Sequence, residues 1–156
     1  MMKSSPLIDT NLLLLFVIGS VDNGHFIDAS KRLGAFSYDD YRLLKEFIDK
    51  FDNFATTPYI LTEVSNLIDL QDYAAEEAFK TLRLVSQLAE VIDVTPSSDT
   101  EHAHFFLYGL TDVNILNIAQ NRAILTNDMR LSNFAYGICP VDNIIPWYLV
   151  TSNQLN

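Results

Sequence analysis

Cysteine and cationic residues are both scarce in this chain of 156 residues. The single cysteine, Cys139, excludes an internal disulfide framework and favours a reducing compartment. Because Cys139 follows an apolar stretch, we expect a buried and unreactive thiol. Ten Lys and Arg oppose twenty Asp and Glu, so the formal net charge is −10. This acidity argues against non-specific nucleic-acid binding, which depends on basic surface.

The chain also lacks a long hydrophobic run. Leu12 to Ile18 is apolar, but a membrane-spanning helix needs about 20 such residues. Lys3 and this run resemble a signal peptide, yet Asp9 and Asn11 interrupt the approach and no A-x-A-like cleavage site follows. With 49% hydrophobic and 19% charged residues, the composition is that of a globular protein. We therefore expect a cytoplasmic protein without a membrane partner, with residues 1–156 forming a single domain.

Three motifs of nucleotide-binding proteins and hydrolases are absent. The chain has no G-x-x-x-x-G-K-[ST] and no G-x-G-x-x-G, so use of a nucleoside triphosphate or a dinucleotide is not expected. It also has no G-x-S-x-G, the motif around the nucleophile of many serine hydrolases.

Short apolar runs alternate with helical patterns along the chain. The predicted strands are Pro6–Asp9, Val91–Val94, Ala123–Thr126 and a last strand near Cys139–Val141. Helical patterns lie between them; one begins with a capping box formed by Ser37 and Asp40, and another begins at Pro58. The alternation predicts an α/β protein with a three-layer α/β/α fold, whose central sheet is mostly parallel.

The segment Gly19–Phe36 is the longest irregular stretch that the pattern predicts. It contains Gly19, Gly24 and Gly34 among residues of mixed polarity. Such a stretch is the best candidate for a flap or a substrate-binding loop.

Four acidic residues occupy positions where a soluble protein seldom places them. Asp9 ends the first predicted strand, and Asp128 follows the strand Ala123–Thr126. Glu63 and Asp112 are each expected near the start of a helix, Asp112 after an N-cap at Thr111, and their apolar neighbours at helical spacing turn them toward the core. Because parallel α/β folds bind ligands outside the carboxyl ends of their strands, we expect the four side chains to converge there. Helix capping alone explains any one of them, since the helix dipole favours acids in the first turn.

Converging carboxylates call for a divalent cation. Without one, their mutual repulsion would raise the pKa of at least one of them. Mg²⁺ and Mn²⁺ accept carboxylate and water oxygens and remove that penalty. His102 and His104 are two positions apart and would point to opposite sides of a helix, so they offer no competing site. Such a metal lowers the pKa of a bound water and stabilises charge on phosphate, which matches phosphodiester hydrolysis.

Four short segments together resemble the PIN-domain nucleases. They follow one another over nearly the whole chain, as Leu7–Asn11, Thr57–Val64, Leu110–Asp112 and Leu125–Asp128. The fold of that family is a parallel sheet between helices, which agrees with the pattern above. Many bacterial members similar to this chain are toxins of VapBC-type toxin–antitoxin pairs.

The resemblance implies a ribonuclease that depends on Mg²⁺ or Mn²⁺. By position, Asp9, Asp112 and Asp128 would be the most direct metal ligands. Glu63 would hold a metal or its water and help to deprotonate the nucleophile. The four acids would thus be both the metal-binding and the catalytic residues, with RNA as the substrate.

Further residues are expected to support this site or to contact RNA. The Thr126 hydroxyl would support the site, and Asn11 would orient Asp9 by a hydrogen bond. Candidate RNA contacts are two cations that flank the last acid and two in the irregular segment: Arg122, Arg130, Lys31 and Arg32. An ordinary surface charge explains each of these cations equally well.

The sequence leaves two questions about protein partners undecided. The segment Gly19–Phe36 offers either an RNA contact or a groove for an antitoxin protein. Tyr136, Trp147 and Tyr148 near the end of the chain are explained either by a homodimer face or by burial in the monomer.

Two other functions compete with the nuclease. One is a PIN-fold interaction module that cleaves little, which the acidic composition favours and the intact acids disfavour. The other is a Mg²⁺-dependent phosphatase, similar to haloacid dehalogenases, with Asp9 as nucleophile. That family has Asp where this chain has Asn11, and it has a later lysine, whereas no lysine follows Lys80.

Overall fold

The computed structural model describes residues 5–153, which alternate between short strands and helices. The elements are, in chain order, β1 (Leu7–Ile8), α1 (Thr10–Gly19), the 3₁₀ helix η1 (Val21–Gly24), α2 (Tyr38–Ile48), β2 (Ala55–Thr56), α3 (Pro58–Leu67), α4 (Asp72–Leu88), β3 (Glu90–Val91), α5 (Pro96–Asp99), α6 (Phe105–Ile118), β4 (Ile124–Thr126), α7 (Met129–Ala135), the 3₁₀ helix η2 (Val141–Asn143), β5 (Ile144–Pro146) and α8 (Trp147–Ser152). None of these helices is long and apolar enough to cross a bilayer.

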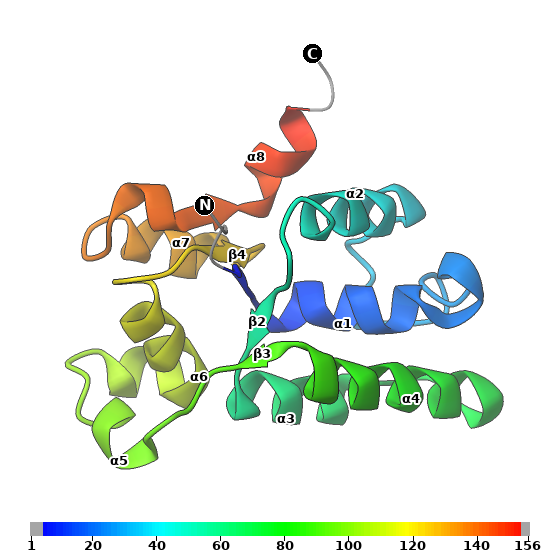
Figure 1. Cartoon of the computed structure of the whole chain (residues 1–156), viewed down its shortest axis with the longest axis horizontal. Helices are drawn as coiled ribbons and strands as arrows, with labels where there is room; N and C mark the ends of the chain where they lie inside the picture. Colours follow the sequence, from blue (N-terminus) through cyan, green and yellow to red (C-terminus); the bar gives the residue numbers. More distant parts are fainter. Residues whose placement is uncertain (1–4, 154–156) are drawn as a thin grey trace.

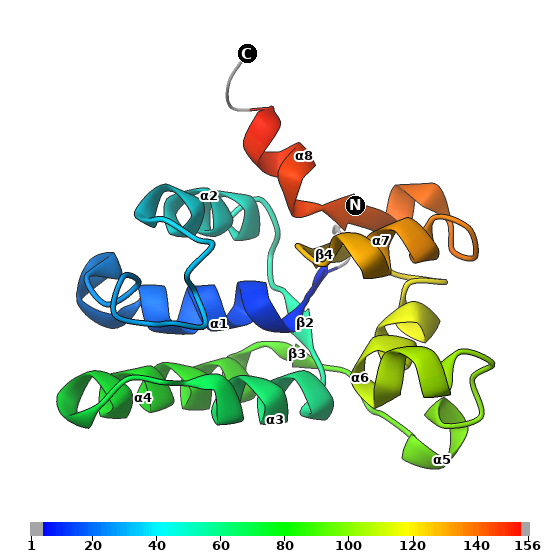
Figure 2. The same cartoon turned by 180° about the vertical axis from the view of Figure 1, so that it is seen from behind.

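The five strands form one sheet in the order β3-β2-β1-β4-β5, and every neighbouring pair is parallel. Leu7 pairs with Ala55 on one side and with Ile124 on the other, so β1 is the central strand. Helices α1 to α4 extend on one side of the strands, and α5 to α7 lie on the other (Figure 1). The view from behind shows the same division (Figure 2). The predicted three-layer α/β/α fold is therefore confirmed.

The first helix, α1, is buried because nearly all of its side chains are apolar. The side chains from Leu12 to Leu15 are fully buried, and so are Val17 and Ile18. A helix that is hydrophobic all round needs cover on every side. Helices α2, α3 and α4 provide this cover by packing along α1 (Figure 1). This packing fixes the start of α1 against the carboxyl end of β1.

The sequence pattern misplaced one strand and missed another. The last strand is Ile144–Pro146, whereas the predicted range near Cys139–Val141 contains a turn and the start of η2. Cys139 is buried, and burial raises the pKa of its thiol, as expected for an unreactive cysteine. The missed strand, β2, has only two residues and leads directly into the Thr57 cap of α3, so its apolar run is too short to detect.

The segment Gly19–Phe36 is irregular, as predicted, but it is not a flap over the acidic residues. It packs into the core through Val21, Ile27 and Leu33, each at most 3% exposed. It lies at the end of α1 that points away from the sheet (Figure 1). Because α1 has ten residues, this end is about 15 Å from Asp9.

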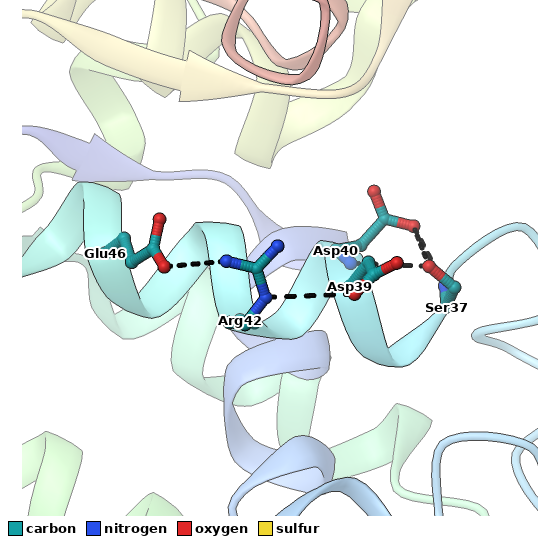
Figure 3. Close-up of polar contacts among 5 residues, drawn as sticks. All are labelled: Ser37, Asp39, Asp40, Arg42 and Glu46. Atoms are coloured by element: carbon teal, nitrogen blue, oxygen red, sulfur yellow. Dashed lines mark hydrogen bonds and ion pairs between the residues drawn. The ribbon is translucent and has the colours of Figure 1, made fainter. Parts of the chain in front are cut away.

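Helix α2 begins with the predicted capping box. The Ser37 hydroxyl accepts a hydrogen bond from the Asp40 amide at 3.3 Å, and an Asp40 carboxylate oxygen accepts one from the Ser37 amide at 2.8 Å. One turn later, Arg42 lies between Asp39 and Glu46 at 3.7 and 2.8 Å on the exposed face (Figure 3). Arg42 is therefore paired with two acids of its own helix.

The C-terminal aromatic residues divide between burial and exposure. Trp147 is 6% exposed, and its indole N–H donates to Asp40 at 3.2 Å, which ties α8 to α2. Tyr148 is 46% exposed. Burial in the monomer thus explains Trp147, and no homodimer is needed to cover it.

Candidate active site

Asp9 lies at the carboxyl end of the central strand and begins α1. One carboxylate oxygen accepts the Thr10 amide at 2.7 Å, and the other accepts the Thr126 hydroxyl at 2.5 Å. The side chain is buried, and this burial raises the pKa of Asp9 above its ordinary value. The hydrogen bonds from Thr126 and Thr10 oppose the rise, while the charges of Asp128 and Glu63 add to it.

Asp128 follows the neighbouring strand β4 and caps α7. Its carboxylate accepts the Leu131 amide at 3.0 Å. Its own amide donates to the Thr126 hydroxyl at 3.0 Å. One threonine hydroxyl therefore links Asp9 and Asp128, which is the contact that the predicted supporting role of Thr126 requires.

Glu63 reaches the same region from the middle of α3, not from the start of a helix. Its carboxylate accepts two hydroxyl hydrogen bonds, from Thr10 at 3.0 Å and from Thr111 at 2.7 Å. Thr10 follows Asp9, and Thr111 precedes Asp112. Glu63 is therefore held between the segments that carry two of the other acids. Its exposed side chain marks the solvent side of the group.

Asp112 lies in α6, three residues after a break in the helix. The break is Gly109, whose φ of 81° is a conformation that residues with a Cβ rarely adopt. Burial raises the pKa of Asp112 to about 7, and the charges of Asp9, Asp128 and Glu63 add to the rise. The positive charge of Arg130 opposes it.

The four acids lie near one another, linked by the hydroxyls of Thr10, Thr111 and Thr126, and the charges of the other three act on Asp112. We call Asp9, Glu63, Asp112 and Asp128 the acidic cluster. Burial decreases from Asp9, which is 8% exposed, through the half-buried Asp112 and Asp128 to the exposed Glu63. Helix capping accounts for Asp9 and Asp128, and Asp112 lies in the first turn after the break at Gly109, but a helix start does not account for Glu63 in the middle of α3.

The chemistry of the acidic cluster suits a hard divalent cation. All its donors are carboxylate oxygens, which Mg²⁺ and Mn²⁺ accept, and a cation would relieve the repulsion that raises the pKa of Asp112. Across residues 5–153, no three Asp, Glu, His or Cys side chains are arranged to hold one metal ion together. Coordination by three members of the cluster therefore requires side-chain movement.

Two buried oxygens at the same edge of the sheet add to the polar character of the site. Thr56 Oγ1, at the end of β2, and Asn127 Oδ1, just after β4, have no hydrogen-bond partner within the described part of the chain. Buried polar atoms are normally paired, so each of them calls for a water or a ligand atom.

Of the four predicted RNA contacts, only Arg130 lies beside the acidic cluster. Its charge acts on Asp112, its guanidinium carbon lies 4.6 Å from the centre of the Tyr108 ring, and Nη2 donates to the Leu107 carbonyl at 3.3 Å. Arg130 is exposed and is the second residue of α7, two positions after Asp128. It remains a candidate for a phosphate contact.

The prediction for Arg122 is wrong because this residue lies at the amino end of the sheet. It precedes β4, and its guanidinium donates to both oxygens of Glu90, the first residue of β3, at 2.9 and 2.8 Å. It also donates to the Ser5 carbonyl, just before β1, at 2.6 Å. Arg122 and the acidic residues therefore lie at opposite ends of the strands.

Lys31, Arg32 and Asn11 do not contribute to the cluster as expected. Lys31 and Arg32 are exposed in the segment beyond the far end of α1, where the Arg32 amide donates to Asp69 at 3.2 Å. Asn11 is exposed, and the hydrogen bonds that orient Asp9 come from Thr10 and Thr126 instead. Asn11 lies in the first turn of α1, just before the fully buried stretch Leu12–Leu15.

Thr10 and Thr111 are the site residues that the sequence reasoning missed. Each directly adjoins an acid of the cluster, and each donates its hydroxyl to Glu63. The adjacency was visible in the sequence, but Thr111 was expected to cap a helix. Only the approach of α3 to both segments shows that the hydroxyls point to Glu63.

A separate buried polar network lies around Asp99. This buried carboxylate accepts the Tyr59 hydroxyl at 3.0 Å and the side-chain amides of Asn114 and Asn117 at 3.2 Å. The hydrogen bond and charge of Asp99, with burial as the largest cause, raise the pKa of Tyr59 to about 12. A cavity of about 510 Å³ adjoins this network. Since its donors already satisfy Asp99, we regard the network as a structural link between α3, α5 and α6.

Within residues 5–153, the histidines are not arranged to hold a metal ion. His102 and His104 lie in the turns before α6 rather than in a helix, and their ring centroids are 5.7 Å apart. The His102 Nδ1 accepts the His104 amide at 3.0 Å, so the backbone already occupies that nitrogen.

Fold and site together define an α/β protein with a group of carboxylates at the carboxyl edge of a parallel sheet. Hydroxyl and amide groups position these carboxylates, and no salt bridge to them occurs among residues 5–153. No family model matches the chain, and no significantly similar curated protein or solved structure is found.

Proposed function

We propose that the protein is a metal-dependent ribonuclease of the PIN type that hydrolyses RNA phosphodiester bonds with Mg²⁺ or Mn²⁺. The observation that carries the proposal is the convergence of Asp9, Glu63, Asp112 and Asp128, where burial, with the charges of the other three acids added, raises the pKa of Asp112 to about 7. Strongly perturbed carboxylates that share one site are typical of functional positions. We expect the protein to act in the cytoplasm.

The four acids would hold the metal, which supplies an activated water and stabilises charge on the phosphate. Asp9 is fixed from two sides by Thr10 and Thr126, so its oxygens are preorganised. Glu63, exposed and held by two hydroxyls, is the member placed to accept a proton from an incoming water. Arg130 is placed to contact a phosphate beside Asp112.

The proposal is tested by incubating the purified protein with single-stranded and structured RNA in Mg²⁺, in Mn²⁺ and in EDTA. We expect cleavage only with metal, and a loss of more than about 100-fold in the Asp9→Asn variant, since even changes beyond the metal ligands cost 10–100-fold. Asn preserves the shape of the side chain and removes its charge.

Asp142→Asn serves as the matched control because Asp142 is exposed in η2, just before the amino end of β5. Activity equal to wild type is expected for this variant. Intact RNA under every condition, with well-folded protein, would overturn the ribonuclease proposal. Turnover of a phosphomonoester in the same assay would favour the phosphatase instead.

A toxin role with an antitoxin partner is a narrower form of this proposal. It predicts a small neighbouring gene that encodes a DNA-binding protein, and inhibition of RNA cleavage when the two proteins are mixed. Cleavage without such a partner would support the ribonuclease and remove the toxin role. Metal-dependent RNA binding without any cleavage would favour the interaction module.

A further inference from the structure

The second residue of helix α6, Phe106, has an almost fully exposed aromatic side chain, whose ring centroid lies 5.5 Å from that of Phe105. Phe106 is 98% exposed, and the next residue, Leu107, is 59% exposed. The two aromatic residues on the other side of this turn are packed, because His104 and Tyr108 lie 4.6 and 4.9 Å from the Phe134 ring of α7. The turn is therefore anchored on one side and presents Phe106 to solvent on the other.

This turn borders the acidic cluster. Arg130 donates to the Leu107 carbonyl and stacks on Tyr108, and its charge acts on Asp112. Five residues after Phe106, Thr111 donates to Glu63. Five residues span at most about 17 Å even when extended, so Phe106 and the carboxylates are within reach of one short strand of RNA.

Charge alone gives this protein little means of holding RNA. The net charge is −10, Arg122 is paired with Glu90, and Arg42 and Lys80 lie in ion pairs on α2 and α4. A single strand can instead be held by stacking of its bases on aromatic side chains and on arginine, which does not depend on basic surface.

We propose that Phe106, together with Arg130, forms a base-stacking rim beside the acidic cluster, so that stacking of an unpaired base contributes more to RNA affinity than charge does. This inference rests on the proposed ribonuclease function for its substrate, but it concerns binding rather than cleavage. The exposed ring would stack on a base, while the Arg130 guanidinium would contact the adjoining phosphate.

The test measures binding of fluorescent U₁₀ and A₁₀ oligonucleotides by anisotropy under two conditions that exclude cleavage: wild-type protein in EDTA and the Asp9→Asn variant in Mg²⁺. Phe106→Ala is expected to weaken binding by about 5- to 100-fold, the range for loss of one base–aromatic stack. Phe106→Trp should retain affinity. The logarithm of the binding constant should fall with the logarithm of salt concentration with a slope near −0.7, about one phosphate contact.

Phe79→Ala is the matched control, since Phe79 is 45% exposed on α4, on the other side of the sheet (Figure 2). Equal affinities for Phe106→Ala and Phe79→Ala would overturn the inference, and so would the absence of RNA binding by the parent protein in both conditions. A change in sedimentation of Phe106→Ala without a change in RNA affinity would also overturn it, and would identify a protein contact instead.

The outcome is separable from that of the proposed function. RNA binding that depends on Phe106, without cleavage in Mg²⁺ or Mn²⁺, would support the rim and contradict the ribonuclease. Metal-dependent cleavage with RNA affinity and KM unaffected by Phe106→Ala would support the ribonuclease and contradict the rim.

Discussion

Two groups of charged side chains lie at opposite ends of the same parallel sheet. At the amino end, Arg122 binds both carboxylate oxygens of Glu90, and these hydrogen bonds lower the pKa of Glu90 below its usual value. At the carboxyl end, burial and mutual repulsion raise the pKa of Asp9 and of Asp112. The carboxylate at the amino end of the sheet is thus paired with a guanidinium, whereas the carboxylates at the carboxyl end face one another.

The difference separates a structural role from a functional one. A bidentate pair holds the first residue of β3 to the segment before β4 and leaves neither charge available. The acidic cluster disfavours its own ionised state, which is a cost to the fold unless a cation binds. Buried carboxylates with a shared repulsion are therefore the better candidates for chemistry.

The largest effect is expected from substitution of Thr126, because its one hydroxyl forms hydrogen bonds with both Asp9 and Asp128. Thr126→Val keeps the shape of the side chain and removes both hydrogen bonds. We expect kcat/KM for RNA cleavage to fall by about 10- to 100-fold, the usual cost of losing a group that orients metal ligands. Thr126→Ser, which keeps the hydroxyl, should restore most of the activity. Equal activities of the Val and Ser variants would show that the hydroxyl is not needed.

Asp112 allows the electrostatic cost of the cluster to be measured as stability. Because the pKa of Asp112 is raised from 3.8 to about 7, the folded protein keeps a proton that the unfolded chain releases within this window. Stability therefore falls as pH rises through it. At pH 8, Asp112→Asn should raise the free energy of unfolding by about 1–2 kcal/mol, after allowance for the partial exposure of the side chain.

Urea unfolding at pH 4 and pH 8 checks this expectation, with Asp142→Asn as the exposed control. The gain for Asp112→Asn should nearly vanish at pH 4, where the wild-type carboxyl is about half protonated even in the unfolded chain. A variant less stable than wild type at pH 8 would mean that Asp112 is not repelled by its neighbours.

Arg122 provides the smallest expected effect and tests the other end of the sheet. Arg122→Met removes the pair with Glu90 but keeps an apolar stem of similar length. We expect the free energy of unfolding to fall by about 1 kcal/mol, the upper range for a surface ion pair, because this pair is only partly exposed. RNA cleavage and binding should stay unchanged. A selective loss of RNA affinity with full stability would restore Arg122 as a substrate contact.

Local patterns predicted the elements that carry the cluster, though with limits. The strands that end at Asp9 and Asp128 and the capping box of Ser37 were found because each depends on a few adjacent residues. The strands β2 and β5 were missed or misplaced, since runs of two or three residues are too short to show a strand pattern of their own. Glu63 was expected at a helix start but lies in the middle of α3.

The sequence by itself determined the alternation of strands and helices and the choice of four acids, because hydrophobic spacing and short motifs are local properties of the chain. Only the tertiary structure decided that Thr10 and Thr111 hold Glu63, that Arg130 lies beside Asp112, and that Arg122 serves the opposite edge. These contacts join residues far apart in the chain, and their partners are chosen by how the helices pack on the sheet.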